Sequence, residues 1–377
     1  MIMSFRRHFQ CRHLVDVLSA STRSLVTISL ARFEAGEIEE ANRLSYACCN
    51  DGFFYLEGHG IPQKVLDDTL HAASTFFDLP AAKKRTAHWS KTDVFPGTLG
   101  LPVRGYVALG EERLGPYPGD DLEQKEAFDW AMEKPTFGDL TPWHGPNLWP
   151  ADPCDRAALE GPLSSFRDMM MDAAARLVRM MCVARGLPST AYDSKFMDPT
   201  IVCRTLRYPP SSSANACGCN AHTDQGFFTL LHQDSVGGLQ VKLRAEEWTD
   251  VKPMHGKLVV NIGDALSADT AGTWRSTLHR VSNQAGKIRH SVALFFDPDA
   301  TVPMLPVAVH KDAQAMEAIK VLLHKAGLRC DEAGLKELGS MEFAEYKKRV
   351  FAKFLPEEEL YEDFTDVKTT TSSLPLQ

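Results

Sequence analysis

The chain reads CNAHTDQGFFTLLHQDSVGGLQV from Cys219 to Val241, and this stretch carries two kinds of information. Its apolar runs, at Phe227–His232 and Gly238–Leu243, are short, rich in β-forming residues and bounded by glycine and polar residues. Such runs predict β-strands joined by turns. The triplet His-Thr-Asp before the first run separates an imidazole from a carboxylate by one residue. An extended backbone therefore places both side chains on the same side.

Similar short runs occur on both sides of this stretch, and helical patterns lie further out. Additional strands are predicted at Ile201–Tyr208, Leu258–Ile262 and Ser291–Phe296. Many short strands with turn residues between them predict an antiparallel barrel or jelly roll. Apolar spacing and helix start and stop signals predict helices at Gly36–Asn50, Gln63–Phe77, Asp155–Leu187, Ala313–Ala326 and Met341–Phe354. The glycine- and proline-rich segment Ser90–Tyr117 is predicted to be a loop.

A metal site is the first chemical hypothesis that the sequence supports. His222 and Asp224 need a third ligand, and His279 is a candidate because it lies directly before another predicted strand. Two imidazoles and one carboxylate on one face of an octahedron leave three positions open, an arrangement that iron(II) oxygenases use. Thiolates would favour zinc, and Cys-Gly-Cys at 217–219 raises that alternative, although no second cysteine pair accompanies it.

A candidate carboxylate clamp follows ten residues after His279, where the chain reads Arg289, His290, Ser291. The planar guanidinium of arginine can bind both oxygens of a carboxylate. A hydroxyl two positions later on a strand lies on the same face and can contribute to the same contact. Taken alone, this pair is better interpreted as a surface arginine at the start of a strand.

Several other residues are given structural interpretations. His59 lies between two glycines, so it is interpreted as a turn or cap residue. Asn261 and Asp264 are predicted to lie in a turn and to bond to the backbone. The methionine cluster of the long helix is interpreted as core filling, because methionine adapts to irregular gaps.

Taken in order, these segments resemble the core of the iron(II)/2-oxoglutarate-dependent oxygenases related to isopenicillin N synthase. The resemblance rests on His-Thr-Asp at 222–224, Gly-Gly-Leu-Gln-Val at 237–241, Asn-Ile-Gly-Asp at 261–264, His-Arg-Val at 279–281, Arg-His-Ser at 289–291 and Phe-Phe-Asp-Pro at 295–298. Upstream, Asp-Gly-Phe-Phe-Tyr at 51–55 and Gly-His-Gly-Ile-Pro at 58–62 resemble the N-terminal region of that family. The resemblance covers about residues 25–355.

The resemblance implies a fold and a role for each candidate residue. The implied fold is mostly β with flanking helices: a double-stranded β-helix (jelly-roll) core, a helical N-terminal cap and C-terminal helices. The implied ligands of Fe(II) are His222, Asp224 and His279. The implied contacts to the distal carboxylate of 2-oxoglutarate are Arg289, Ser291 and Tyr208. One departure is Leu206, because many plant members have asparagine two positions before the tyrosine.

The implied activity is oxidation of a small organic molecule with O₂ and 2-oxoglutarate, which releases succinate and CO₂. Hydroxylation is the default outcome, and desaturation or cyclisation needs only a different substrate pose. Two alternatives stay open at this point. One is an oxidase like isopenicillin N synthase or aminocyclopropane carboxylate oxidase, which share these motifs without using 2-oxoglutarate. The other is a non-catalytic jelly-roll binding protein.

The expected organisation has five segments. They are an N-terminal extension at 1–24, an oxygenase cap region at 25–190, the jelly-roll core at 191–300, a C-terminal helical region at 301–365 and a disordered tail at 366–377. The extension is rich in arginine and serine and has one acidic residue, which is typical of either a mitochondrial targeting sequence or a disordered arm. Its cleavage is left open.

Bulk properties limit the partners. The 377 residues carry a net charge of −8 and no basic stretch long enough to follow a phosphate backbone, so nucleic acid is not expected to bind. No apolar run approaches the roughly 20 residues of a membrane-spanning helix. Nine cysteines, an odd number, are expected to be reduced thiols, which favours a cytoplasmic location, with mitochondria as the alternative. The expected partner is a small-molecule substrate, and the sequence leaves the oligomeric state open.

Overall fold

The computed structural model describes residues 24–89, 104–112, 123–133, 146–210, 217–243, 247–284, 286–304 and 313–351, and within them the strands form two sheets. The larger sheet consists of β1 (Thr27–Ser29), β2 (Phe53–Glu57), β3 (Gly105–Val107), β4 (Glu126–Trp130), β5 (Pro199–Tyr208), β7 (Phe228–Gln233), β10 (Leu258–Ile262) and β12 (Arg289–Asp299). The smaller sheet consists of β6 (Cys217–His222), β8 (Leu239–Lys242), β9 (Trp248–Asp250) and β11 (His279–Ser282). All five strands predicted from the sequence are present.

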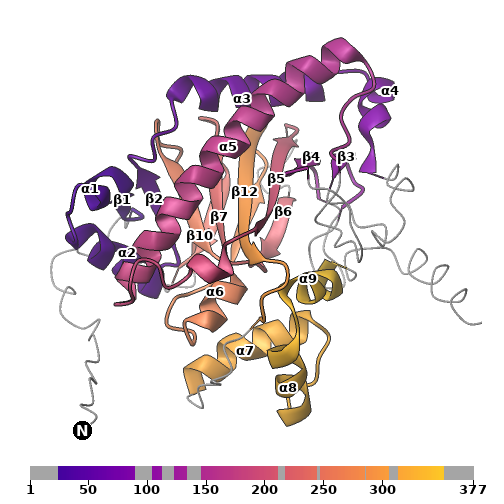
Figure 1. The fold of residues 1–377 in the computed structure, drawn as a ribbon. Coiled ribbons are helices and arrows are strands. Elements are labelled where there is room, and N and C mark those ends of the chain that lie inside the picture. The colour runs from indigo at the N-terminus through magenta and orange to yellow at the C-terminus, as the bar shows by residue number, and fades with distance from the viewer. Residues whose placement is uncertain are drawn as a thin grey trace, which may run out of the picture.

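The order of the strands is β1-β2-β10-β7-β12-β5-β4-β3 in the larger sheet and β6-β11-β8-β9 in the smaller one. Neighbouring strands pair antiparallel, apart from the parallel pair of β1 and β2. Strands from the N-terminal part of the chain therefore extend both edges of a sheet whose centre comes from later strands. Figure 1 shows β2, β10, β7, β12 and β5 side by side in this sheet.

The inner faces of the two sheets pack on each other around a common interior. One buried apolar cluster combines side chains of the larger sheet with side chains of the smaller sheet, among them Tyr55, Leu206, Leu239, Val241 and Val281. Strand β12 shows how alternation divides its residues. Its Val292, Leu294 and Phe296 join the core on the outer face, whereas Arg289, Ser291, Ala293 and Phe295 line the interior. The predicted jelly-roll core is confirmed.

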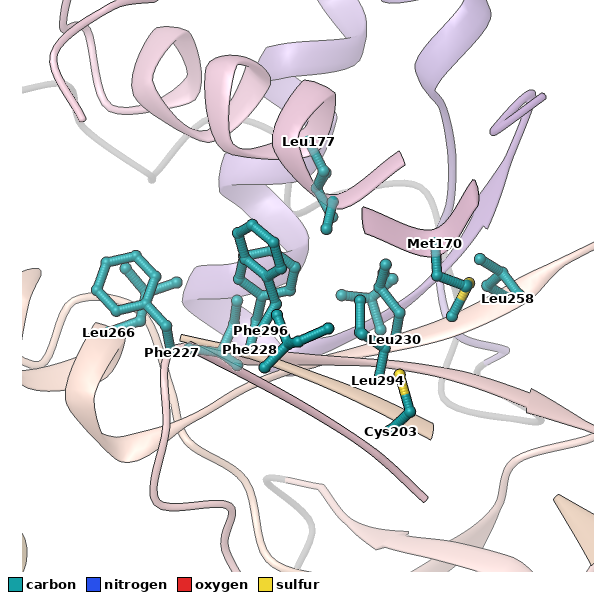
Figure 2. Close-up of a cluster of buried hydrophobic side chains, with 14 of the residues drawn as sticks. Met170, Leu177, Cys203, Phe227, Phe228, Leu230, Leu258, Leu266, Leu294 and Phe296 are labelled. Atoms are coloured by element: carbon teal, nitrogen blue, oxygen red, sulfur yellow. The ribbon is translucent and has the colours of Figure 1, made fainter. Parts of the chain in front are cut away.

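A layer of helices covers the outer face of the larger sheet. The long helix α5 (Pro153–Ala184) is capped at its N-terminus by Asp152, whose carboxylate accepts hydrogen bonds from two backbone N–H groups of the first turn. It crosses the sheet beside α3 (Gln63–Phe77) and near α2 (Glu39–Asn50) (Figure 1). Figure 2 shows side chains of α5 against those of the strands, among them Met170, Leu177, Phe228, Leu230, Leu294 and Phe296. The interpretation of the methionine cluster as core is confirmed for Met170, Met180 and Met181, which are fully buried.

The remaining helices are short or C-terminal. Among the described residues, the short ones are α1 (Leu30–Glu34), α4 (Ala81–Lys84), α6 (Asp264–Asp269) and 3₁₀ turns at Arg85–Ala87 and Asp193–Lys195. After β12 come α7 (Ala313–Lys325), α8 (Glu332–Ser340) and α9 (Phe343–Phe351). Figure 1 shows α6, α7, α8 and α9 gathered at one end of the sheets. The C-terminal helices thus lie at one mouth of the jelly roll rather than on its helical face.

Some local predictions were wrong. The first predicted helix starts at Glu39, because a separate short helix and Gly36, with φ +97°, precede it. Part of the predicted loop at Ser90–Tyr117 forms β3, which pairs with β4 and depends on that tertiary contact. Asn261 lies in strand β10 rather than in a turn, and Asp264 begins α6. Helix α8 was not predicted.

His59 has the structural role that its flanking glycines indicated. Gly58 and Gly60 have φ values of +64° and +80°, and the imidazole Nδ1 of His59 accepts a hydrogen bond from the Ile61 N–H at 3.1 Å. The predicted N-terminal extension, apart from residue 24, and the predicted tail at 366–377 lie outside the described residues. Within the described ranges, no helix combines the length and the apolar character that a membrane span requires.

Candidate active site

Three predicted metal ligands converge at one end of the smaller sheet. His222 is the last residue of β6, His279 is the first residue of β11, and the two are direct partners in the register of this antiparallel pair. Asp224 follows β6 by two residues. One ligand atom from each side chain lies within 4.8 Å of the others. The Nε2 atoms of both histidines lie 3.7 Å from Oδ1 of Asp224.

The other polar atoms of these ligands are already bonded, which fixes the orientation of each side chain. The Nδ1 atoms of His222 and His279 lie 2.7 Å and 3.1 Å from the carbonyl oxygens of Asn220 and Thr277. A carbonyl only accepts, so Nδ1 carries the proton and Nε2 presents its lone pair to the centre of the triad. This donor set and orientation fit a divalent metal ion.

Asp224 is held in the same way through one of its two oxygens. Its Oδ2 accepts hydrogen bonds from the Asn261 amide at 2.6 Å and from the Thr229 hydroxyl. Oδ1 is therefore the oxygen that faces the two imidazoles. Sequence reasoning missed both supporting residues, although the alternation of Phe228–Gln233 and of Leu258–Ile262 could have placed Thr229 and Asn261 on the interior face.

Protonation states agree with metal binding. Burial and the neighbouring His222 lower the pKa of His279 to about 4, so its imidazole is neutral at neutral pH, the form that binds metals. Burial opposes ionisation of Asp224, but the two imidazoles and the hydrogen bonds from Thr229 and Asn261 outweigh it and lower its pKa to about 2.

The cysteines next to the triad do not join it. Burial raises the pKa of the Cys219 thiol to about 12, and its Sγ lies near Lys125 and His222, at 3.7 Å and 3.8 Å. The thiol of Cys217 donates to Asn220 at 2.7 Å. In the described ranges, the group able to hold a metal contains the two histidines and the aspartate without a sulfur atom. The zinc alternative is not supported.

On one side of the triad lies a cavity with Arg289 in its wall, which we call the Arg289 chamber. Arg289 is 1% exposed, and its guanidinium donates to Ser291 Oγ and Gln233 Oε1, both at 3.1 Å. Its carbon lies 4.8 Å from the centre of the Tyr208 ring, and its Nε has no partner among the described residues. Burial raises the pKa of Tyr208 to about 12, so the phenol keeps its proton.

The charge of Arg289 is the main feature of this chamber. Within the described ranges, no carboxylate forms an ion pair with it. The rest of the wall is largely apolar and includes Leu206, Leu231, Leu239, Val281, Ala293 and Phe295. A buried cation without a counter-charge is costly. The chamber is therefore suited to an anionic ligand that reaches from Arg289 to the triad.

A second cavity adjoins the triad, and we call it the Lys347 chamber. It shares Arg204, His222, Asp224, Thr229 and Phe295 with the Arg289 chamber. Its other lining residues include Glu112, Asp129, Val202, Phe228, Asp297 and Lys347. Sequence reasoning did not identify Glu112, Asp129, Arg204 or Lys347, because they come from separate segments with no common motif.

The charges of the Lys347 chamber are paired. Arg204 forms two hydrogen bonds of 2.7 Å to Asp129 and two of 2.9 and 3.0 Å to Glu112. Lys347 contacts Asp297 at 2.9 Å. Burial opposes ionisation of Glu112, but Arg204 and Lys125 outweigh it and lower its pKa to about 2. The carboxylate of Glu112 is therefore ionised, and Asp129 and Asp297 each pair with one of these cations.

Comparisons with known proteins agree with this geometry. The family model described as the 2OG-Fe(II) oxygenase superfamily matches residues 197–298, which include both histidines, Asp224, Arg289 and Ser291. A second model, described as the non-haem dioxygenase in morphine synthesis N-terminal region, matches residues 25–152. A homoarginine-6-hydroxylase of Glycine max is 34% identical over 290 residues, 74% of this chain and 83% of that protein. The chain belongs to the 2OG-Fe(II) oxygenase superfamily.

Solved structures of other members have the same fold. A Neurospora crassa protein in complex with alpha-KG (2-oxoglutarate) and thymine is 26% identical, with a TM-score of 0.64 over 76% of this chain and 89% of that chain. The rice dioxygenase for auxin oxidation is 26% identical, with a TM-score of 0.58 over 83% of this chain and 99% of that chain. This oxygenase is thus an enzyme that uses iron(II) and 2-oxoglutarate and acts on a small molecule. The alternatives of a 2-oxoglutarate-independent oxidase and of a non-catalytic scaffold are set aside.

Proposed function

We propose that His222, Asp224 and His279 bind the catalytic iron(II) as a facial triad. Two observations support this assignment: the ligand atoms Nε2, Nε2 and Oδ1 face a common centre, and hydrogen bonds to the backbone and to Asn261 hold the remaining polar atoms away from it. Neutral imidazole and carboxylate are suitable ligands for iron(II) and leave open positions on the opposite face.

We propose further that Arg289, Ser291 and Tyr208 bind the distal carboxylate of 2-oxoglutarate. The observation that carries this proposal is the fully buried guanidinium of Arg289, which makes no ion pair within the described residues. Its planar fork can hold both oxygens of a carboxylate, and the neighbouring Ser291 and Tyr208 hydroxyls are available for the same group. The apolar wall around them excludes water and strengthens this contact.

When bound, iron(II) and 2-oxoglutarate supply the oxidising chemistry, in which O₂ is consumed, the cosubstrate is converted to succinate and CO₂, and the substrate is hydroxylated. The residues of this chain orient the participants. Arg289 fixes one end of the cosubstrate, and the triad fixes the metal at the other end. Phe295 and Thr229 lie where the two chambers meet. A substrate in the Lys347 chamber is thereby held beside the metal position without displacing the cosubstrate.

The first experiment is an anaerobic titration. Iron(II) and 2-oxoglutarate added to the metal-free protein should produce the weak visible absorption band of their complex, and His279→Ala should abolish the band. Retention of the band in His279→Ala would contradict the triad. Iron binding without any band in the parent protein would contradict binding of 2-oxoglutarate in the Arg289 chamber.

We infer that the substrate is a small polar molecule with hydrogen-bond donors, and that it binds in the Lys347 chamber. Every cation that lines the described part of this chamber is committed to a carboxylate of the chain, so a substrate carboxylate finds no unpaired partner there. The carboxylates of Glu112, Asp129 and Asp297 keep unused acceptor sites for donors. Homoarginine, the substrate that names the soybean relative, has such donors in its guanidinium group, and this end rather than its carboxylate fits the chamber.

Turnover of a small panel tests this inference. With homoarginine, thymine and auxin as candidates, succinate formation above the substrate-free rate should be largest for a donor-rich compound such as homoarginine and smallest for auxin, a carboxylate without a basic group. Auxin as the best substrate of the panel would contradict the inference. The assignment of the triad would be unaffected by that result, because it rests on the iron titration.

A further inference from the structure

The loop that carries Asp224 is attached to the C-terminal helices at both of its ends. This metal-ligand loop, residues 223–227, connects β6, which ends at His222, with β7, which begins at Phe228. Two buried aspartates, Asp264 and Asp297, contact opposite ends of the loop, and each of them pairs with a lysine of a C-terminal helix.

The first attachment is made by Lys325, the last residue of α7. Its ammonium donates to the carbonyl oxygen of Thr223 at 2.9 Å and to the Thr223 hydroxyl at 2.8 Å, and it also pairs with Asp264. The Thr223 hydroxyl in turn donates to Asp264 at 3.1 Å. The backbone N–H of Asp264 donates to the carbonyl oxygen of Asp224 at 2.8 Å. Lysine, aspartate and the first half of the loop therefore form one connected unit.

The second attachment is made by Lys347 of α9. It pairs with Asp297 at 2.9 Å, and both side chains are buried. The other oxygen of Asp297 accepts the backbone N–H of Phe227 at 2.7 Å. A Cβ atom on Gly226 would lie 2.0 Å from the same oxygen, so the loop passes as close to Asp297 as a glycine allows.

We infer that Lys325 and Lys347 are positioning residues, through which the C-terminal helices hold Asp224 in the orientation that binds iron. The lysines neutralise two carboxylates that would otherwise lie unpaired beside a third, the metal ligand itself. They also fix the backbone on both sides of Asp224. Both helices lie outside residues 25–152 and 197–298, which the two family models match, so this attachment is a feature of the remaining part of the chain. The inference rests on the proposed role of Asp224.

A purely structural role is the competing explanation, and the chain offers a matched control for it. Lys195 pairs with Asp269, an almost fully buried carboxylate at the opposite end of α6 from Asp264. Asp269 is also bonded to Arg185 and to Tyr192, and these contacts do not include the metal-ligand loop. Lys195→Met therefore removes an ion pair of the same type and leaves every hydrogen bond of residues 223–227 in place. Its ammonium approaches the loop only over the ring of Phe227, 6.0 Å from the ring centre.

The experiment measures the iron(II) affinity and the free energy of unfolding of four variants: Lys325→Met, Lys347→Met, Lys195→Met and Lys325→Arg. Loss of a residue that orients a metal ligand typically weakens metal binding by roughly 10- to 100-fold. We expect iron(II) affinity to fall by roughly 10- to 100-fold in Lys325→Met and Lys347→Met, and by less than about threefold in Lys195→Met. Lys325→Arg keeps the charge and the donors, so it should restore most of the affinity.

Amide hydrogen exchange of the metal-free protein gives a second readout that is independent of turnover. The amides of residues 223–227 should exchange faster in Lys325→Met and Lys347→Met than in the parent protein, whereas Lys195→Met should leave them unchanged. This comparison needs no iron, so it reports the loop itself.

Distinct outcomes separate this inference from the ligand assignment. Equal iron affinity in Lys325→Met, Lys347→Met and Lys195→Met, with unchanged exchange in the loop, would overturn the positioning role. If Asp224→Ala bound iron as tightly as the parent protein, the ligand assignment itself would fail. Loss of iron in Asp224→Ala together with intact affinity in both lysine variants would remove only the positioning role.

Discussion

The two chambers that meet at the triad treat charge in opposite ways. The Arg289 chamber contains Arg289, which is 1% exposed and makes no ion pair within the described residues. In the Lys347 chamber, Arg204 and Lys347 are each bonded to carboxylates of the chain itself. One chamber is therefore electrostatically incomplete before a ligand binds, whereas the other is already balanced.

This difference indicates two modes of recognition. A buried charge without a partner carries a desolvation cost that an anionic ligand offsets when it binds. The Arg289 chamber is therefore expected to bind its ligand mainly through one ion pair. A cluster whose cations are already paired offers no free counter-charge to an anionic ligand, and it discriminates by shape and hydrogen bonding. Binding through one ion pair suits a cosubstrate that is the same in every turnover. Binding by shape and hydrogen bonds suits a substrate that must be distinguished from similar molecules.

The largest expected effect comes from removing the unpaired charge. Arg289→Met should weaken 2-oxoglutarate binding by on the order of 4 kcal/mol, close to a thousandfold in Kd, because truncating one partner of a buried charge pair leaves the other without compensation. Arg289→Lys keeps the charge but loses the planar fork, so its loss should be intermediate. Anaerobic titration of the iron-loaded protein with 2-oxoglutarate measures both values.

Iron affinity in the absence of cosubstrate is the control for this pair of variants. It should remain close to that of the parent protein, since Arg289 does not contact the triad ligands. A Kd for 2-oxoglutarate within about threefold of the parent value in Arg289→Met, far below the loss expected for a buried pair, would remove the contrast between the chambers.

The same contrast explains which residues could be identified from the sequence. Arg289 and Ser291 lie two positions apart on one strand, and Tyr208 is the direct partner of Arg289 on β5. Short-range spacing and the family pattern were sufficient to predict their neighbourhood. The charged residues of the Lys347 chamber could not be predicted. Glu112 and Asp129 meet Arg204 only after β4 has paired with β5, and Lys347 reaches Asp297 only after α9 has packed beside the end of β12. Asn261 shows the same limit: the strand Leu258–Ile262 was predicted, but Asn261 was assigned to a turn, and its bond to Asp224 forms only when β10 pairs with β7.

A smaller effect is expected from the balanced chamber, and it concerns stability at different pH values. The pKa of Glu112 is about 2 in the folded protein and near 4.5 without its partners. A lowered folded pKa contributes stability that is fully present above about pH 4.5 and is lost as the pH falls towards 2. Glu112→Gln removes this contribution, so it should lower the free energy of unfolding by on the order of 2 kcal/mol at pH 7. Denaturant unfolding at a series of pH values measures the difference between the two proteins.

The pH profile, rather than the size of the loss, decides whether the cluster is ionic. The difference in unfolding free energy between the parent protein and Glu112→Gln should be constant between pH 7 and pH 5. It should shrink as the pH falls further, because Glu112 takes up a proton near pH 4.5 in the unfolded chain but only near pH 2 in the folded protein. Glu345→Gln, on the exposed side of α9, provides the control, since its side chain is 47% exposed and pairs with Arg349 at the surface. A difference for Glu112→Gln that stayed constant down to pH 3 would mean that the carboxylate contributes through packing and neutral hydrogen bonds. The Lys347 chamber would then lack the balanced charges that distinguish it from the Arg289 chamber.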